Sequence, residues 1–256
     1  MLVVPSTCSR TTCWRRCRTT SPRSSKRFRS TGPSPSTGSK RGRPASSSRA
    51  GRISSARRRR RTFFDAKTFP GARAIVNEPN QVLPFAALAA GIPADKLFPV
   101  DLDKAFALLD KIKSDVSVWP SSGDQQQQVL RSGEVDMAIM WNGRAYDLIQ
   151  KGTPLDIVWD GALLDPGYIV VLKDAPHKDL AFKYMEYYAT HPEQQADWAK
   201  VLPYGMANKK VASLLPEKVS DALPSSHDVV RIDPSWFAAN QKEIAKRWQE
   251  FLAGAQ

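Results

Sequence analysis

The 256-residue chain carries a formal net charge of +13 at pH 7, and this charge is divided unevenly along it. Residues 1–62 hold 18 Lys and Arg and no acidic residue, a net +18, whereas residues 63–256 hold 20 Lys and Arg against 25 Asp and Glu, a net −5. No apolar run reaches the roughly 18 residues that a membrane-spanning helix needs, so we expect no membrane insertion.

Residues 1–62 consist mostly of Arg, Ser, Thr, Pro, Gly and Ala. This composition offers too little apolar surface to offset the entropy lost on ordering, so it predicts disorder. GC-rich DNA translated in the wrong frame yields the same residue types, and ordinary globular composition begins abruptly at Phe63. We therefore interpret this segment as disordered or frame-shifted.

The three cysteines, Cys8, Cys13 and Cys17, all lie in this basic segment, which contains no His. Their spacing matches no established zinc pattern, so we expect neither a metal nor another cofactor. An arginine pair follows Trp14, but no apolar stretch comes after the pair, so no export signal is visible.

The run Arg57–Arg61 supports an alternative function, a nucleic-acid-binding protein that uses the Arg-rich segment. The acidic remainder of the chain offers no second basic surface, so we do not expect nucleic acid as a partner. Salt-dependent binding that vanishes without residues 1–62 would favour this alternative.

Residues 63–172 alternate between predicted strands and predicted helices. Short apolar runs bounded by turn residues predict the strands, and apolar residues spaced three and four apart predict the helices. This alternation predicts an α/β fold with a mainly parallel sheet. The predicted strands are 74–76, 116–119, 135–141 and 155–159; the predicted helices are 82–90, 104–113, 124–131 and 144–151; another apolar run spans 168–172.

Residues 173–256 differ in character, because their amphipathic patterns predict helices at 178–190, 193–201 and 241–252, joined by loops. We therefore divide the chain into three parts. These are the basic segment 1–62, an α/β lobe over 63–172, and a helical segment over 173–256.

Polar and aromatic side chains follow three of the predicted strands, and ligands of open α/β sheets bind beyond the carboxyl ends of strands. A carboxylate among aromatic rings suits a cationic amine, through charge pairing and cation–π contact. A structural alternative stays open for each cluster: helix capping at Glu78, a core position for Trp141, and turn formation around Asp165. The candidate ligand-binding residues are Glu78, Gln81, Trp141, Asn142, Asp165 and Tyr168.

The sequence contains no G-x-S-x-G, Walker, H-E-x-x-H or G-x-G-x-x-G motif. The histidines, His177, His191 and His227, lie beside Pro or Ser and have no metal-ligand spacing. We therefore do not expect an enzyme.

Several segments resemble the bacterial extracytoplasmic solute-binding proteins of ABC importers, of the spermidine/putrescine-binding type. Their order along the chain makes the resemblance more specific than any one of them, and it extends over about residues 63–251. The matching segments are 63–71, which resembles the start of the family's second lobe, 132–144 around a tryptophan of the binding site, 157–164, 174–181 and 203–209.

The resemblance implies a type II periplasmic-binding-protein fold, with one fairly complete α/β lobe and a helical C-terminal remainder of the other lobe. It implies a receptor that binds a small amine-type solute between two lobes, outside the cytoplasm or in the periplasm, and delivers it to an ABC permease. Residues 1–62 stand where most of the first lobe would be, so we expect binding by this chain to be impaired.

The resemblance assigns ligand-binding positions of the family to individual residues of this sequence. Trp141 falls on an aromatic residue that stacks on the ligand, and Glu78 falls on a carboxylate that binds a ligand nitrogen. Gln81 falls near a second acidic position, and Gly167 falls on a family aspartate, with Asp165 two residues earlier. These departures favour a solute that is smaller or less charged than spermidine.

Overall fold

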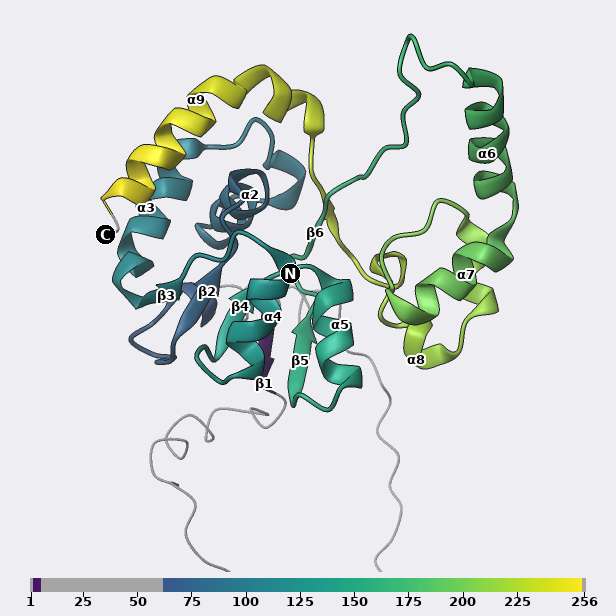
Figure 1. Cartoon of the computed structure of the whole chain (residues 1–256). Coiled ribbons are helices and arrows are strands. Elements are labelled where there is room, and N and C mark those ends of the chain that lie inside the picture. Colours follow the sequence, from purple (N-terminus) through teal and green to yellow (C-terminus); the bar gives the residue numbers. More distant parts are fainter. Residues whose placement is uncertain (1, 6–61, 255–256) are drawn as a thin grey trace, which may run out of the picture.

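The computed structural model describes residues 2–5 and 62–254 (Figure 1). The predictions made for residues 6–61, including the three cysteines and the arginine run, lie outside the described residues. None of the helices in the described part is both long and apolar enough to cross a membrane.

A five-stranded sheet with the order β3-β2-β4-β1-β5 forms the centre of the α/β lobe. Strand β2 is parallel to β3 and to β4, whereas β1 is antiparallel to both β4 and β5. The mainly parallel sheet expected from the sequence is therefore found only among β2, β3 and β4, because the insertion of β1 between β4 and β5 makes the whole sheet mixed. The strands are β1 Leu2–Pro5, β2 Arg73–Ile75, β3 Val116–Val118, β4 Met137–Ile139 and β5 Leu155–Val158.

Strand β1 belongs to the segment for which we predicted disorder, and the prediction is wrong at these four residues. Leu2 pairs with Ile139 on one side and with Val158 on the other. The stretch Leu2–Val4 is apolar and contains two β-branched valines, which favours a strand. A slot between two strands of the same direction also offers partners for both of its backbone edges, which local composition cannot reveal.

Helices cover both faces of the sheet, and β4 shows how two cores are separated. Met137 and Ile139 belong to the core beneath α2, α3 and α9, whereas Ala138 and Met140 belong to the core beneath α4 and α5. This alternation follows from the two-residue period of a strand. The helices are α2 Pro79–Ala89, α3 Leu102–Ile112, α4 Gly123–Arg131, α5 Asn142–Gln150 and α9 Pro234–Ala253.

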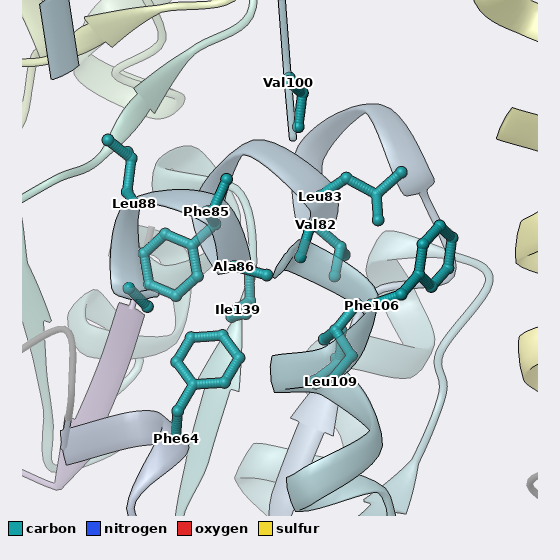
Figure 2. Packing of buried hydrophobic residues seen from close by; sticks show 14 of the residues in the cluster. Phe64, Val82, Leu83, Phe85, Ala86, Leu88, Val100, Phe106, Leu109 and Ile139 are labelled. Carbon is teal, nitrogen blue, oxygen red and sulfur yellow. The ribbon is translucent and has the colours of Figure 1, made fainter. Parts of the chain in front are cut away.

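The larger core is rich in aromatic rings (Figure 2). Phe64 packs against Phe85 of α2 with ring centroids 5.8 Å apart, close to Ile139 of the sheet. The buried guanidinium of Arg73 donates to the carbonyl oxygens of Phe63 and Phe69 at 2.7 and 2.6 Å. These bonds hold the segment that leads into β2 against the sheet.

Helix α9 begins earlier than predicted, at Pro234, because Asp233 caps it by accepting from the backbone N–H groups of Ser235 and Trp236. It returns to the α/β lobe, where Trp248 Nε1 donates to Asn77 Oδ1 at 2.7 Å. The C-terminal helix therefore packs on the α/β lobe, although it belongs to the segment 173–256.

The remaining helices form a smaller unit that stands beside the lobe (Figure 1). Two short parallel strands, β6 Leu163–Leu164 and β7 Val230–Arg231, pair with each other where the chain leaves the lobe and where it returns. The helices of this unit are α6 Lys178–Thr190, α7 Pro192–Val201 and α8 Glu217–Ser220. The 3-10 helices in the described part of the chain are Ala94–Lys96, Lys113–Asp115, Lys209–Leu214 and Pro224–Ser226.

The apolar run 168–172 lies outside any strand, and α6 has no buried residue. In the part of the chain that the structure describes, nothing covers the apolar side chains of these two segments. Apolar surface of this extent is typical of an interaction face. The exposed side chains are Tyr168, Ile169, Val170, Leu172, Leu180, Phe182, Tyr184 and Tyr187.

Candidate functional site

A cavity of about 1010 Å³ lies between the α/β lobe and the unit formed by α6–α8. Residues from the end of β4, from β6 and β7, and from α6 all contribute to its wall. The segments that line it are drawn from 139–142, 159–169, 185–189, 204–207 and 224–232, together with Gln81.

Five of the six predicted residues line this cavity: Gln81, Trp141, Asn142, Asp165 and Tyr168. Glu78 is not among the lining residues. It occupies the N-cap position of α2, directly before Pro79, but its side chain makes no capping hydrogen bond. The carboxylate of Glu78 therefore does not cap α2, and its contact with a ligand stays a prediction.

Trp141 contacts both the larger hydrophobic core and the cavity. It is the N-cap residue of α5, two positions after the end of β4; it is half-buried, packs against the larger core, and also lines the cavity. Only Met140 and Trp141 separate the end of β4 from the start of α5 at Asn142. The indole ring can therefore support the fold with one part of its surface and present another part to a ligand.

Asn142 is held by two loops of the smaller unit. Its Nδ2 donates to the carbonyl oxygen of Pro203 at 2.6 Å and to that of Ala222 at 3.1 Å. Both amide hydrogens are used by these bonds, since a side-chain amide nitrogen has two. Asn142 thus positions the wall of the cavity, and its Oδ1 remains as the acceptor for a ligand.

Tyr204 approaches the next residue of α5 very closely. A Cβ atom built on Gly143 would lie 2.7 Å from Cζ of the Tyr204 ring, which leaves room only for glycine. Burial raises the pKa of the Tyr204 hydroxyl, and the nearby Arg144 opposes this effect. A half-buried, neutral phenol is therefore part of the cavity wall.

Two further aromatic rings stack at the edge of the cavity. The rings of Trp159 and His227 lie with centroids 4.0 Å apart and an angle of 11° between their planes. Trp159 follows β5, whereas His227 precedes β7, so the stack joins the two parts of the molecule. Trp159 lies in the segment 157–164, whose family resemblance was noted, but no local pattern placed His227 beside it.

Asp165 follows β6 and faces Gln81 of α2. Partial burial of the carboxyl group raises the pKa of Asp165, and hydrogen bonding by the Gln81 side chain opposes the rise. Asp165 as a whole residue is nevertheless exposed, so water and ligands reach it. The pairing brings together two predicted residues that are more than 80 positions apart.

Sequence reasoning missed several other lining residues, including Tyr188, Tyr204, Met206 and Arg231. Tyr204 lies in a segment, 203–209, whose family resemblance was noted, and this was the available signal. No local pattern indicated Arg231. Among the residues with described positions, no group of His, Cys, Asp and Glu converges to hold a metal ion.

An α/β lobe joined by two strands to a second unit, with an aromatic cavity between them, has the architecture of a solute receptor. The chain belongs to the bacterial extracellular solute-binding proteins, because the model of that family matches residues 61–224. The family is one of solute-binding proteins and not of enzymes. The predicted family and the predicted type II periplasmic-binding fold are both confirmed.

Among curated relatives, the chain is 32% identical over 200 residues to the gamma-aminobutyric acid-binding protein of Pseudomonas aeruginosa, covering 75% of this chain and 56% of the relative. It is 24% identical over 155 residues to the spermidine/putrescine-binding periplasmic protein of Escherichia coli, covering 60% of this chain and 44% of the relative. The chain thus spans about half the length of these relatives.

Solved structures give the same result for the fold. The Atu4243–GABA receptor structure superposes with a TM-score of 0.68 at 35% identity, over 75% of this chain and 60% of that one. An ABC transporter substrate-binding protein from Bradyrhizobium japonicum has the same TM-score at 31% identity, over 75% of this chain and 62% of that one.

Proposed function

We propose that this chain forms the ligand-binding part of a receptor for a small amine-bearing solute, and that it acts outside the cytoplasm by presenting the solute to the permease of an ABC importer. The observation that carries the proposal is the cavity between the two units, whose lining residues include the aromatic Trp141, Trp159 and Tyr168 and the acidic Asp165. Aromatic faces and a carboxylate are the groups that recognise an alkylammonium ion.

The connection between the two units supports a binding cycle. Only two short strands, β6 and β7, link the α6–α8 unit to the lobe, and both lie against the cavity. Such a double connection suits a hinge motion in which the units close around a ligand. The names of the two curated relatives support an amine as the solute, because one relative is a gamma-aminobutyric acid-binding protein and the other a spermidine/putrescine-binding protein.

The test is calorimetric titration of the full chain with gamma-aminobutyrate (GABA) and with putrescine, and with sucrose as a neutral control. Saturable binding of at least one of the two amines, without binding of sucrose, is the expected result. A chain that binds sucrose, or that binds neither amine while it remains folded by circular dichroism, would contradict the proposal.

The nucleic-acid alternative depends on the Arg-rich segment, which lies outside the described residues except for 2–5. No observation on the described residues favours that alternative. Residues 63–256 carry the net −5 found in the sequence, which repels rather than attracts a polyanion.

A further inference from the structure

The run Tyr168–Leu172 has the sequence of a strand but pairs with no other strand of the described structure. Its residues, Tyr-Ile-Val-Val-Leu, are aromatic, β-branched or aliphatic, which favours a strand. Among the described residues, the only hydrogen bond to the backbone of the run comes from the N–H of Ala175, which donates to the carbonyl oxygen of Leu172 at 3.1 Å. The other backbone groups of the run can therefore pair with a further strand, as at the open edge of a sheet.

An apolar groove lies between this run and α6. Its volume is about 320 Å³, and its lining residues include Ile169, Val170, Leu180 and Tyr184. Figure 1 shows the chain passing directly from β6 through this region into α6. Leu180, Tyr184 and Tyr187 are spaced four and three residues apart, so they share one side of the helix. We define the apolar face as these three residues together with Tyr168, Ile169, Val170 and Leu172.

The size of the apolar face matches one half of a stable interface between proteins. Its seven side chains are 46–75% exposed. Because large apolar side chains cover about 150–250 Å² each when fully buried, the face offers on the order of 800 Å². Each partner in an interface of standard size contributes about 800 Å². A single partner that covers the whole face would therefore form a stable complex.

The charges at the two ends of the run indicate which partner fits. Asp165 lies four residues before Ile169 and Lys173 lies four residues after it, and both are exposed. Two copies of the run, paired antiparallel about Ile169, would place Asp165 of each copy opposite Lys173 of the other. A parallel pair would place like charges opposite each other, which is destabilising. The run is therefore complementary to a second copy of itself, in the antiparallel direction.

We propose that the apolar face is a dimer interface, and that its occupant is the same face of a second copy of this chain. The two runs pair as antiparallel strands across a two-fold axis, so each copy uses the same residues and the assembly closes at two chains. Strand pairing supplies the backbone hydrogen bonds, and removal of both apolar faces from water supplies the main driving force. This inference goes beyond the proposed function and does not depend on it.

Sedimentation velocity of the full chain over a series of concentrations tests the proposal, because it measures mass independently of ligand binding. We expect a reversible equilibrium between monomer and dimer. Val170→Lys should weaken the dimer by at least about tenfold, since it would bury an unpaired charge in the interface. Val201→Lys on α7 is the matched control: Val201 is 67% exposed but lies outside the apolar face, so the dimer constant should not change.

A charge exchange tests the direction of pairing. Lys173→Asp alone should weaken the dimer, because it places two carboxylates opposite each other at both ends, and Asp165→Lys added to it should restore the dimer. A parallel pair would show no such rescue. Circular dichroism confirms that each variant is folded. A folded wild type that stays monomeric would overturn the proposal and leave the face to a different protein. Equal dimer constants of Val170→Lys and Val201→Lys, or association that continues beyond two chains, would also overturn it.

Discussion

The side-chain amide of Asn142 donates a hydrogen bond to the carbonyl oxygen of Pro203 at 2.6 Å. Its second amide hydrogen goes to the carbonyl oxygen of Ala222. These bonds connect the first residue of α5 to loops on either side of α8, so they hold the smaller unit against the lobe in this arrangement. A residue expected to contact the ligand therefore also positions the wall of the cavity.

Asn142→Asp should lower the free energy of unfolding by about 1–3 kcal/mol, because a carboxylate oxygen would face two carbonyl oxygens and leave them without donors. Urea unfolding followed by circular dichroism measures this loss. Asn240→Asp is the control, since the Asn240 side chain bonds only to Trp236 of its own helix and should matter less. Equal stability of Asn142→Asp and the wild type would show that the two bonds do not hold the units together.

Trp141→Ala should weaken amine binding by about tenfold, because a stacking face in a cavity contributes on the order of 1–2 kcal/mol. Calorimetric titration measures the affinity, and thermal melting measures the stability. Trp119→Ala is a matched control, because Trp119 packs against Trp248 and Phe251, with ring centroids 5.9 and 5.5 Å away, and does not line the cavity.

The control should lose about 3–5 kcal/mol of stability and keep its affinity. If Trp141→Ala behaves in the same way, with a much lower melting temperature and unchanged affinity of the folded fraction, the indole of Trp141 has a core role only.

The affinity for an amine should fall as the pH is lowered, and it should fall earlier than for an ordinary carboxyl group. Partial burial raises the pKa of Asp165, so the ionised form that pairs with an ammonium ion is lost at a higher pH. The stability of the ligand-free protein depends on pH in the opposite direction. Because the folded-state pKa is raised, the contribution of Asp165 to stability is present at low pH and is lost as the pH rises through that pKa.

Gln81→Met should move the midpoint of the affinity profile to higher pH, because the hydrogen bonding that opposes the rise in the pKa of Asp165 is removed. Titrations across a pH series, with Asp165→Asn as a variant that cannot titrate at this position, measure the midpoint. A profile of the wild type that matches that of Asp165→Asn would rule out a role of the Asp165 carboxylate in binding.

Gly143→Ala should destabilise the protein by about 1–3 kcal/mol, because the new methyl group would overlap the ring of Tyr204. In an unobstructed helix the same change would stabilise by roughly 1 kcal/mol. A double-mutant cycle separates the two effects. In a Tyr204→Ala background, Gly143→Ala should become neutral or stabilising, and additive effects of the two substitutions would contradict the close packing.

Val3→Pro should lower the free energy of unfolding by about 1–3 kcal/mol, since proline lacks the N–H that a strand between two neighbours must donate. Val3 pairs with Ala138 on one side and with Ile157 on the other. Val3→Thr, which keeps the N–H and the β-branched shape, should cost much less in the same denaturation experiment. If Val3→Pro is as stable as the wild type, β1 does not contribute to the folded sheet.

Local sequence patterns were sufficient for most of the helices and strands. The amphipathic pattern at 178–190 matches α6 residue for residue, and the apolar run 135–141 contains β4. The order of these elements also predicted the parallel pairing of β2 with β3 and β4 and five residues of the cavity, because the carboxyl ends of parallel strands meet at one edge of a sheet. These features depend on neighbouring residues and on connection rules, both of which a sequence displays directly.

Other features depended on contacts between distant segments. Leu2–Pro5 forms a strand because β4 and β5 leave a slot, Tyr204 lies against Gly143, and Arg231 enters the cavity because β7 pairs with β6. A local pattern specifies which face of an element is apolar or charged, but it does not specify which remote segment meets that face. That choice is made by the packing of the whole chain, so only the tertiary structure brought Arg231 and Asp165 to the same cavity.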